Sequence, residues 1–405
     1  MTNPVLDLLQ HQIAARHCPG ALLLVERAGQ VLARLALGRI HPDAAAPLHA
    51  GVRFRIASLT KPVVTVAALM LVDEGRLDLD APVAEILPAL RGLRLADGSL
   101  AMPGPTVRDL MRHTAGFAYP QEVPHAALRA AWTAAALAPG RAGLDGAGLL
   151  AGLAALPLVN APGAAFRYGY STDVLGLVVE ALDGVPLATA LQRRLFGPLG
   201  MRHTGFEIAE GEVLATAFAD DAAWHASVAP IGQRQAGAAW MDSGGGGLVS
   251  TLDDYAAFAR MLADGGVVRG AVGASVGAAV GAAVGAAAGA AAVAPAGAPV
   301  VASPGGQRLL SERLFAALSR NQLADGVDGP SGYTGPGFGF GLGLAVRHDW
   351  GPSAMPCSAG ELTWSGISGT ALFVQPRERW FAVLMSANMA SRMMARMALR
   401  RALVA

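Results

Sequence analysis

The segment from Phe54 to Gly75 constrains the fold more than any other part of the chain. Its first four residues, FRIA, lead to Ser58, and from Val63 onward its apolar residues recur at helical spacing until Gly75. Pro62 is tolerated only in the first turn of a helix, where its missing N–H breaks no hydrogen bond. The sequence therefore predicts a buried helix with Ser58 at its N-terminus.

Strand patterns occur near both ends of the chain, and helical patterns fill the stretch between them. The predicted strands are a hairpin that turns at Ala28 and Gly29 and three later segments, at 338–346, 371–374 and 381–385. The first residues of the chain and the segment 389–403 have apolar residues at helical spacing. Both ends therefore supply helices that can cover one sheet.

These patterns predict an α/β (α+β) fold. One antiparallel sheet would be flanked by the N- and C-terminal helices and would carry an inserted, mainly helical domain. The expected boundaries are 1–66 with 207–405 for the sheet domain and 67–206 for the helical domain. With 405 residues, 53% of them hydrophobic, the chain is long enough to bury a large core.

Residues 270–307 form a low-complexity Gly/Ala insertion without a charged residue. Glycines recur every four residues from Gly273 to Gly289, a pattern that also occurs where helices pack in membranes. However, Leu, Ile and Phe are absent, Pro295 and Pro299 interrupt the end, and charged flanks are missing. We predict a flexible loop or a surface helix and expect no membrane span.

Charge and composition narrow the classes of partner. The 31 basic and 30 acidic residues give a net charge of +1, which favours a small-molecule substrate over nucleic acid or an anionic membrane. Cys18 and Cys357 are the two cysteines, so a disulfide framework or a multi-cysteine zinc site is excluded, although one bridge is compatible. The N-terminus lacks a basic region followed by an apolar run, and a cytoplasmic location is expected.

The nine histidines do not fall at metal-ligand spacing, so neither a metal nor another cofactor is predicted. His113 lies in the segment HTAGF. We interpret it as a structural residue that forms hydrogen bonds.

Ser58-Leu59-Thr60-Lys61 is the strongest candidate for chemistry, because residues three apart share one face of a helix. Lys61 is the only lysine in the chain. A lysine amine can lose its proton when it is desolvated, whereas a guanidinium stays protonated. At a helix N-terminus the Ser58 N–H is free to stabilise a developing oxyanion. The alternative interpretation is an N-cap serine beside a solvated lysine.

The stretch FRIASLTKPVVTVAALMLVDEGRLDLDAPVAEILP resembles the nucleophile region of the serine β-lactamase and penicillin-binding-protein superfamily, especially class C β-lactamases and family VIII carboxylesterases. Four later segments agree in order: TVRDLMRHTAGF, PLGMRHTGF, GGGGLVSTLDDYAAFARML and GFGFGLGLAV. The resemblance covers nearly the whole chain apart from the Gly/Ala insertion. It implies a β-lactamase/transpeptidase-like fold and an acyl-enzyme on Ser58, with Lys61 as the activating group.

The second motif of this superfamily begins with a tyrosine, and FRYGYSTDVLG offers two. Tyr168 precedes Asp173 by the five residues that the esterase branch has, so the resemblance implies that Tyr168 is catalytic. Tyr170 stands where the lactamase pattern has asparagine and is expected to bind substrate. A phenol beside an amine can take the serine proton and return it to the leaving alcohol. Whether Lys61 or Tyr168 is the kinetic base stays open.

The third motif of the superfamily is Lys-Thr-Gly, and this chain has Trp364-Ser365-Gly366 in its place. The sequence is similar to the Trp-Gly-Gly of family VIII esterases. An indole cannot pair with the carboxylate of a lactam, although the Ser365 hydroxyl can still donate a hydrogen bond. By this resemblance the N–H of Ile367 is the second oxyanion donor beside that of Ser58.

The predicted function is a serine carboxylesterase that cleaves small-molecule esters without a cofactor. A β-lactamase or D-amino-acid peptidase on the same scaffold, an acyltransferase, and a catalytically silent binding protein are the alternatives. The sequence predicts no oligomeric state.

Overall fold

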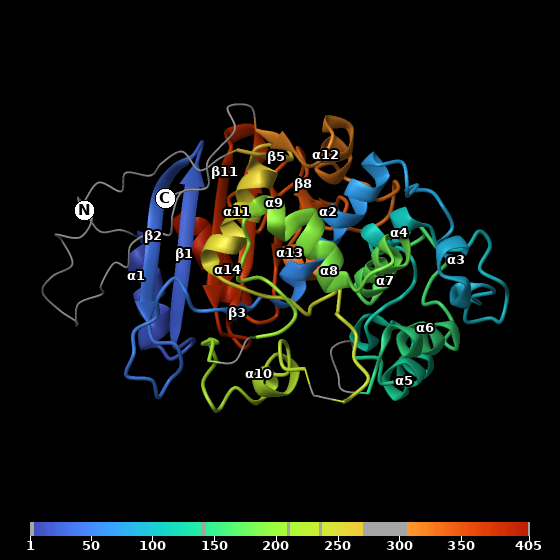
Figure 1. Ribbon diagram of the computed structural model, residues 1–405, viewed down its shortest axis with the longest axis horizontal. Coiled ribbons are helices and arrows are strands. Elements are labelled where there is room, and N and C mark those ends of the chain that lie inside the picture. Colours follow the sequence, from blue (N-terminus) through green and yellow to red (C-terminus); the bar gives the residue numbers. More distant parts are fainter. Residues whose placement is uncertain (1–3, 139–142, 209–210, 235–236, 270–305, 404–405) are drawn as a thin grey trace, which may run out of the picture.

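The computed structural model describes residues 4–138, 143–208, 211–234, 237–269 and 306–403. A seven-stranded antiparallel sheet forms its centre, in the order β2-β1-β11-β10-β9-β8-β7 (Figure 1). Its strands are β1 (Gly20–Arg27), β2 (Gln30–Gly38), β7 (Phe338–Phe340), β8 (Ala345–Arg347), β9 (Leu362–Ser365), β10 (Ala371–Gln375) and β11 (Trp380–Ser386). The two ends of the chain therefore build one sheet, because β1 pairs with β11.

The predicted N-terminal hairpin is confirmed, and its turn explains why it forms. Arg27 pairs with Gln30, so Ala28 and Gly29 are the two turn residues. Both have positive φ, 50° and 84°, as a tight two-residue hairpin turn requires. Glycine adopts such an angle without strain, so the sequence signal and the geometry agree.

Three helices cover the sheet: α1 (Pro4–Ala14), α11 (Leu252–Ala263) and α14 (Arg392–Ala402). The guanidinium of Arg400 in α14 lies over the Trp380 ring. That of Arg260 in α11 lies over the ring of Phe381. Neighbouring residues of a strand point to opposite faces, so α11 and α14 cover opposite faces of the sheet, and α1 packs against α14. The predicted fold class is confirmed.

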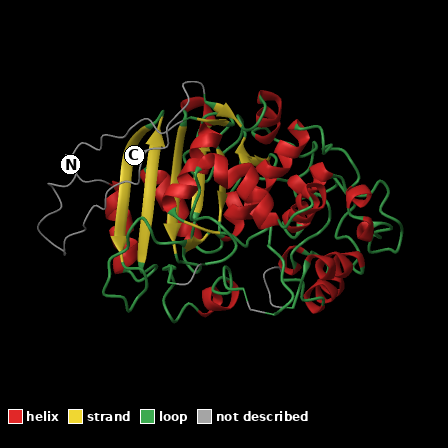
Figure 2. Ribbon diagram, in the orientation of Figure 1, coloured by secondary structure: helices red, strands yellow, loops and turns green. Residues whose placement is uncertain are grey.

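Most of the remaining helices lie beside the sheet rather than on it (Figure 2). The buried helix α2 (Thr60–Asp73) packs against α7 (Ser171–Asp183), which also contacts α4 (Val107–Met111). The other helices are α3 (Val83–Ile86), α5 (Ala126–Ala134), α6 (Gly146–Ala154), α8 (Leu187–Leu191), α9 (Gly197–Leu199), α10 (Ala222–Ser227), α12 (Glu312–Leu318) and α13 (Ser331–Thr334), with single turns η1 (Ala57–Leu59), η2 (Pro88–Leu90), η3 (Pro120–Glu122), η4 (Gln192–Phe196) and η5 (Pro376–Glu378). The predicted domain boundaries stay a prediction.

The segment predicted as one strand at 338–346 is a hairpin, so that prediction was wrong. Strands β7 and β8 pair with each other, and Phe340 lies opposite Ala345. Gly343 in the turn has a φ of 81°, and a Cβ there would lie 2.5 Å from Thr65 Oγ1. The glycines that looked like part of an alternating strand are therefore turn residues that let the chain pass close to α2.

The two ends of the Gly/Ala insertion lie side by side. Strand β5 (Val267–Val268) pairs antiparallel with β6 (Gln307–Arg308), so Gln307 belongs to a strand and not to the insertion. The loop or surface helix predicted between them lies outside the described residues. In the described ranges, no single helix has the length and hydropathy to cross a bilayer, and one pair, Ser171–Asp183 with Leu187–Leu199, meets that test only across a 76° bend.

Candidate active site

Ser58 lies in a tight turn that joins the sheet side of the molecule to α2. Strand β3 (Phe54–Arg55) pairs with β4 (Val249–Ser250), and Ala57 then adopts a left-handed backbone with a φ of 45°. That conformation is uncommon for a residue with a side chain. Ser58 is half-buried between two buried neighbours, and its hydroxyl has no hydrogen-bond partner among the described residues. The turn therefore presents a free hydroxyl at the start of α2.

Lys61 is almost fully buried, with 1% of its surface exposed. Its Nζ donates to the Gly245 carbonyl at 2.7 Å and to the Tyr119 hydroxyl at 3.3 Å. The same nitrogen lies 4.5 Å from the centre of the Tyr168 ring. A carbonyl, a phenol and an aromatic ring thus surround the amine, and no carboxylate contacts it in the described part of the chain.

Tyr119 is a candidate site residue that the sequence did not reveal. It follows the HTAGF segment but has no motif of its own, and it meets Lys61 across 58 residues of sequence. Burial raises its pKa well above the ordinary value for a tyrosine, and the nearby Asp173 raises it further. Tyr119 is therefore a neutral phenol beside the amine.

Tyr168 and Trp364 are brought together as a pair. The Trp364 indole N–H donates to the Tyr168 hydroxyl at 3.3 Å, and the ring centres are 5.3 Å apart. A Cβ on Gly169 would lie 2.1 Å from the Phe117 carbonyl, so only glycine allows these two backbone segments to approach so closely. That approach places Tyr119 and Tyr168 next to each other, with ring centres 5.5 Å apart.

Tyr170 lies behind Tyr119 as part of an aromatic cluster. Its ring stacks on Trp132 with an interplanar angle of 14° and meets the Tyr119 ring edge-on at 4.8 Å. Burial raises the pKa of Tyr170 above its ordinary value. The described contacts of Tyr170 are with these rings and not with Lys61, so its role in substrate binding stays a prediction.

The end of β9 lies against the backbone that precedes Ser58. A Cβ on Gly366 would lie 2.4 Å from the Ile56 carbonyl, and Thr370 donates its hydroxyl to the same carbonyl at 3.2 Å. Within the described ranges, neither the Ser58 N–H nor the Ile367 N–H has an acceptor. Both donors are thus available for an oxyanion, which is the role predicted for them.

Arg396 donates a hydrogen bond to the Ser365 side chain. The sequence did not predict this contact. Nη1 of Arg396 donates to Ser365 Oγ at 2.8 Å and to the Tyr333 carbonyl at 3.1 Å. Because an arginine can only donate, Ser365 accepts this bond and keeps its own proton to donate elsewhere. Burial lowers the pKa of Arg396 to about 10, which still leaves it charged at neutral pH.

The prediction that His113 forms structural hydrogen bonds was wrong for its side chain. His113 is fully buried, and neither ring nitrogen has a partner among the described residues. Its ring packs against Tyr168 at 4.8 Å. Burial lowers the pKa of His113 well below its ordinary value, and nearby Lys61 adds to this, so the imidazole is neutral. Its backbone carbonyl does accept a bond, from Arg167 N–H at 2.8 Å.

The first two of the glycines 244–247 pack closely against the start of α7. A Cβ on Gly244 would lie 2.5 Å from the Thr172 carbonyl, and a Cβ on Gly245 would lie 2.3 Å from Asp173 Oδ2. Real Cβ atoms do not approach other atoms so closely, so side chains are excluded at both positions. The loop therefore runs directly against the start of α7.

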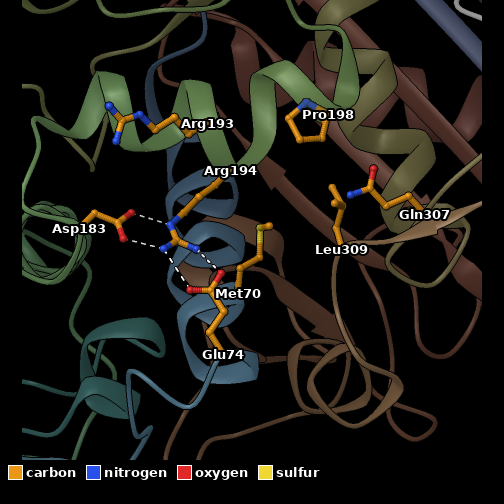
Figure 3. Close-up of a pocket in the computed structure, with 8 residues that line it drawn as sticks. All are labelled: Met70, Glu74, Asp183, Arg193, Arg194, Pro198, Gln307 and Leu309. Carbon is orange, nitrogen blue, oxygen red and sulfur yellow. Dashed lines mark hydrogen bonds and ion pairs between the residues drawn. The ribbon is translucent and has the colours of Figure 1, made fainter.

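A cavity of about 380 Å³ lies at the far end of α2 and is separate from these residues (Figure 3). Met70, in its wall, is nine residues beyond Lys61, roughly 13 Å along the helix. Arg194 crosses the cavity and binds Glu74 at 2.6 Å and Asp183 at 2.5 Å (Figure 3). These paired charges brace α2 against α7.

The described side chains offer neither a metal site nor a reactive thiol. Across the described ranges, no group of three His, Cys, Asp or Glu side chains converges. Cys18 and Cys357 are both free, and burial raises the pKa of the Cys18 thiol to about 12. A thiol with a raised pKa is protonated at neutral pH and is a poor nucleophile.

The fold and site correspond to a known family, because the family model described as Beta-lactamase matches residues 5–405. The chain belongs to the beta-lactamase family. Esterase EstB from Burkholderia gladioli is 34% identical over 386 residues, which cover 93% of this chain and 87% of EstB. Monacolin J acid methylbutanoyltransferase from Aspergillus terreus is 30% identical over 205 residues, 48% of this chain and 47% of its own.

Solved structures agree on the fold. EstCE1, described as a hydrolase with promiscuous acyltransferase activity, has a TM-score of 0.77 at 24% identity and covers 99% of this chain and 98% of its own. A putative beta-lactamase from Bacteroides dorei has a TM-score of 0.59 at 19% identity, covering 95% and 90%. The predicted family and the predicted β-lactamase/transpeptidase-like fold are therefore confirmed.

Proposed function

We propose that this protein is a serine carboxylesterase that acts on small-molecule esters through an acyl-enzyme on Ser58. The observation that carries the proposal is the free Ser58 hydroxyl at the start of the helix that also holds the buried Lys61. The similarity to esterase EstB over most of both chains supports the ester as the substrate class. The fold alone would not identify the substrate class, since one scaffold supports several activities.

In the first half-reaction, Ser58 Oγ attacks the carbonyl carbon of the ester. Its proton passes to Lys61 or Tyr168, and the negative oxygen that forms accepts hydrogen bonds from the N–H groups of Ser58 and Ile367. The intermediate then collapses and the C–O bond to the alcohol breaks. The alcohol leaves with the proton that the base received, and the acyl group stays on Ser58.

In the second half-reaction, water attacks the acyl carbon and gives a proton to the same base. The bond to Ser58 Oγ breaks, the carboxylic acid leaves, and Ser58 regains its proton. Tyr168 fits the role of proton carrier because the Trp364 indole N–H donates to its oxygen at 3.3 Å. A donor at this position stabilises negative charge on the phenol oxygen while the proton is elsewhere.

The third motif favours esters over lactams. Trp364 is buried and binds Tyr168, so it supplies neither a charge nor a hydroxyl for the carboxylate of a lactam. Ser365 can still donate to an acceptor on the substrate. We expect turnover of short-chain nitrophenyl esters to exceed turnover of nitrocefin.

Acyl transfer is a second candidate function, since one relative is named a methylbutanoyltransferase. An alcohol that replaces water in the second half-reaction produces a new ester by the same bond changes. Addition of a small alcohol to the ester assay separates the two outcomes. A transferase forms the new ester in excess of the free acid, and a hydrolase releases mainly the acid.

The test of the proposed function is hydrolysis of nitrophenyl acetate and butyrate by Ser58→Ala. We expect kcat/KM to fall by roughly a thousandfold or more, because the covalent route is lost. Ser319→Ala is the matched control, since that hydroxyl binds the Phe315 carbonyl at the end of α12. Ester hydrolysis that persists in Ser58→Ala at the rate of the control would disprove the mechanism.

A cytoplasmic location is part of this proposal. Both cysteines are unpaired, which is the state that a reducing compartment maintains. Cell fractionation with an antibody to the native protein tests it, and recovery mainly outside the cytoplasmic fraction would contradict it.

A further inference from the structure

Asp173 is a buried carboxylate to which the proposed mechanism gives no role. It lies in the first turn of α7 with 1% of its surface exposed. Its Oδ1 accepts hydrogen bonds from Ser243 Oγ at 2.6 Å and from Gly245 N–H at 2.9 Å. Its Oδ2 has no partner among the described residues. A half-satisfied buried carboxylate is costly and calls for an explanation.

Gly245 connects this carboxylate to the catalytic centre. The Gly245 N–H binds Asp173, and the Gly245 carbonyl accepts from Lys61 Nζ at 2.7 Å. A Cβ on Gly245 would lie 2.3 Å from Asp173 Oδ2, so the backbone itself fills the space between the two charged groups. Asp173 therefore fixes the position of the acceptor that holds Lys61.

The other titratable groups around Lys61 are aromatic. Tyr119 and Tyr168 contact it directly, His113 lies behind Tyr168, and Tyr170 lies behind Tyr119. Burial raises the pKa of Tyr119 and Tyr170 and lowers that of His113, so these three are neutral near pH 7. None of them balances a positive charge on the amine.

Asp173 differs from these groups because the positive charge of Lys61 acts on its carboxyl. Burial raises the pKa of the Asp173 carboxyl, while the charge of Lys61 and the bonds from Ser243 and Gly245 oppose that rise. Opposite charges in a buried site stabilise each other's charged forms. The backbone of Gly245 keeps the pair from closing into a direct ion pair.

We propose that Asp173 is the counter-ion and positioning residue of Lys61, which holds the amine through Gly245 and sets the pH range in which it can accept a proton. The proposal rests on the proposed function, since it concerns the base at Ser58. With Asp173 charged, the ammonium form of Lys61 is favoured. Without that charge, Lys61 loses its proton at a lower pH.

The first test is the pH dependence of ester kcat/KM in Asp173→Asn. Asparagine keeps an oxygen for Ser243 and Gly245 but removes the charge, so we expect the acidic limb of the profile to move down by about one pH unit. Ser243→Ala is the matched control, because it removes one bond to Asp173 and keeps the charge. Its acidic limb should stay in place. Lower activity in Asp173→Asn with an unmoved limb would overturn the proposal and leave only a structural role.

The second test does not depend on activity, because Lys61 is the only lysine in the chain. Protein labelled with ¹³C-lysine gives one side-chain Cε signal in an NMR titration. In Ser58→Ala protein its midpoint should drop by about one pH unit when Asp173→Asn is added. This readout separates a failure of the proposal from a failure of the esterase function.

If Asp173→Asn does not fold, a titration of the wild-type protein tests the proposal instead. Two coupled groups titrate together, so ionisation of Asp173 must appear as a second, acidic step in the Lys61 Cε signal. The folded range of pH is checked by circular dichroism in the same samples. A single-step titration across that range would overturn the proposal.

Discussion

Two buried cations in this protein are held in opposite ways. Arg400, in α14, binds Glu361 through two bonds, of 2.5 and 3.1 Å, and both side chains are almost fully buried. Lys61, in α2, contacts a carbonyl, a phenol and a ring instead of a carboxylate. A bidentate guanidinium–carboxylate pair fixes a permanent charge, whereas an amine without a direct ion pair can release its proton more easily. The first arrangement stabilises the fold, and the second fits the role proposed for Lys61 as a base for Ser58.

Composition supports the same contrast. The chain has 31 basic residues besides histidine, and Lys61 is the only lysine among them. Ion pairs throughout the described structure use arginine, including the Arg194 brace between Glu74 and Asp183. The one basic side chain that can be deprotonated at moderate cost therefore lies beside the candidate nucleophile.

The largest effect is expected from Lys61→Arg. The guanidinium keeps a positive charge but cannot accept the Ser58 proton, so ester kcat/KM should fall by roughly a thousandfold or more. Steady-state kinetics with nitrophenyl butyrate measures this, and circular dichroism shows whether the variant is folded. A folded Lys61→Arg variant that keeps more than about a tenth of the wild-type kcat/KM would contradict the contrast, because it would show that the cation at this position does not need to release a proton.

Glu361→Gln tests the structural cation. The change leaves Arg400 buried without a counter-charge and should lower the free energy of unfolding by roughly 3 to 5 kcal/mol. Urea denaturation measures the loss, and kcat/KM of the folded protein should stay within about threefold of wild type.

The exposed pair of Arg27 and Glu378, at 2.9 Å, is the matched control. Both partners are largely accessible to water, with 56% and 44% of their side chains exposed, so Glu378→Gln should cost less than about 1 kcal/mol. Equal stability of the two variants would show that burial adds nothing to the Arg400 pair.

A smaller difference in kcat/KM is expected between variants of the two tyrosines beside Lys61. Tyr168→Phe removes the proposed proton carrier and should lower kcat/KM by about a hundredfold. Tyr119→Phe removes a single hydrogen-bond acceptor and should cost about fivefold. Kinetics of the two variants under identical conditions decide between them, and the reverse order of effects would assign the proton transfer to Tyr119.

Local signals in the sequence led to Ser58 and Lys61, and periodicity led to the sheet built from both ends. Tyr119 and Asp173 were missed as site residues because they reach Lys61 only through tertiary contacts. The spacing of Asp173 identified Tyr168 but did not reveal that Asp173 lies near Lys61. Arg396 was missed for the same reason, since α14 brings it under Ser365 from another part of the chain.

Two groups of glycines show what the sequence pattern leaves out. Gly343 looked like part of an apolar strand at 338–346, but its positive φ makes it a turn residue between β7 and β8. By contrast, Gly244 and Gly245 had no clear partner in the sequence, and their packing against Thr172 and Asp173 explains why no side chain fits there. Sequence pattern identifies a glycine's freedom but not the neighbour that requires it.

The central claim, that Ser58 is a nucleophile whose activation depends on Lys61, is tested most directly by intact-mass analysis after a fluorophosphonate probe. The probe reacts with activated serines, and ordinary serines do not react. Wild-type protein should gain the mass of one adduct, which peptide mapping places on Ser58, and Lys61→Arg and Ser58→Ala should gain none. An unmodified wild-type protein, or an adduct of equal yield in Ser58→Ala, would contradict the account.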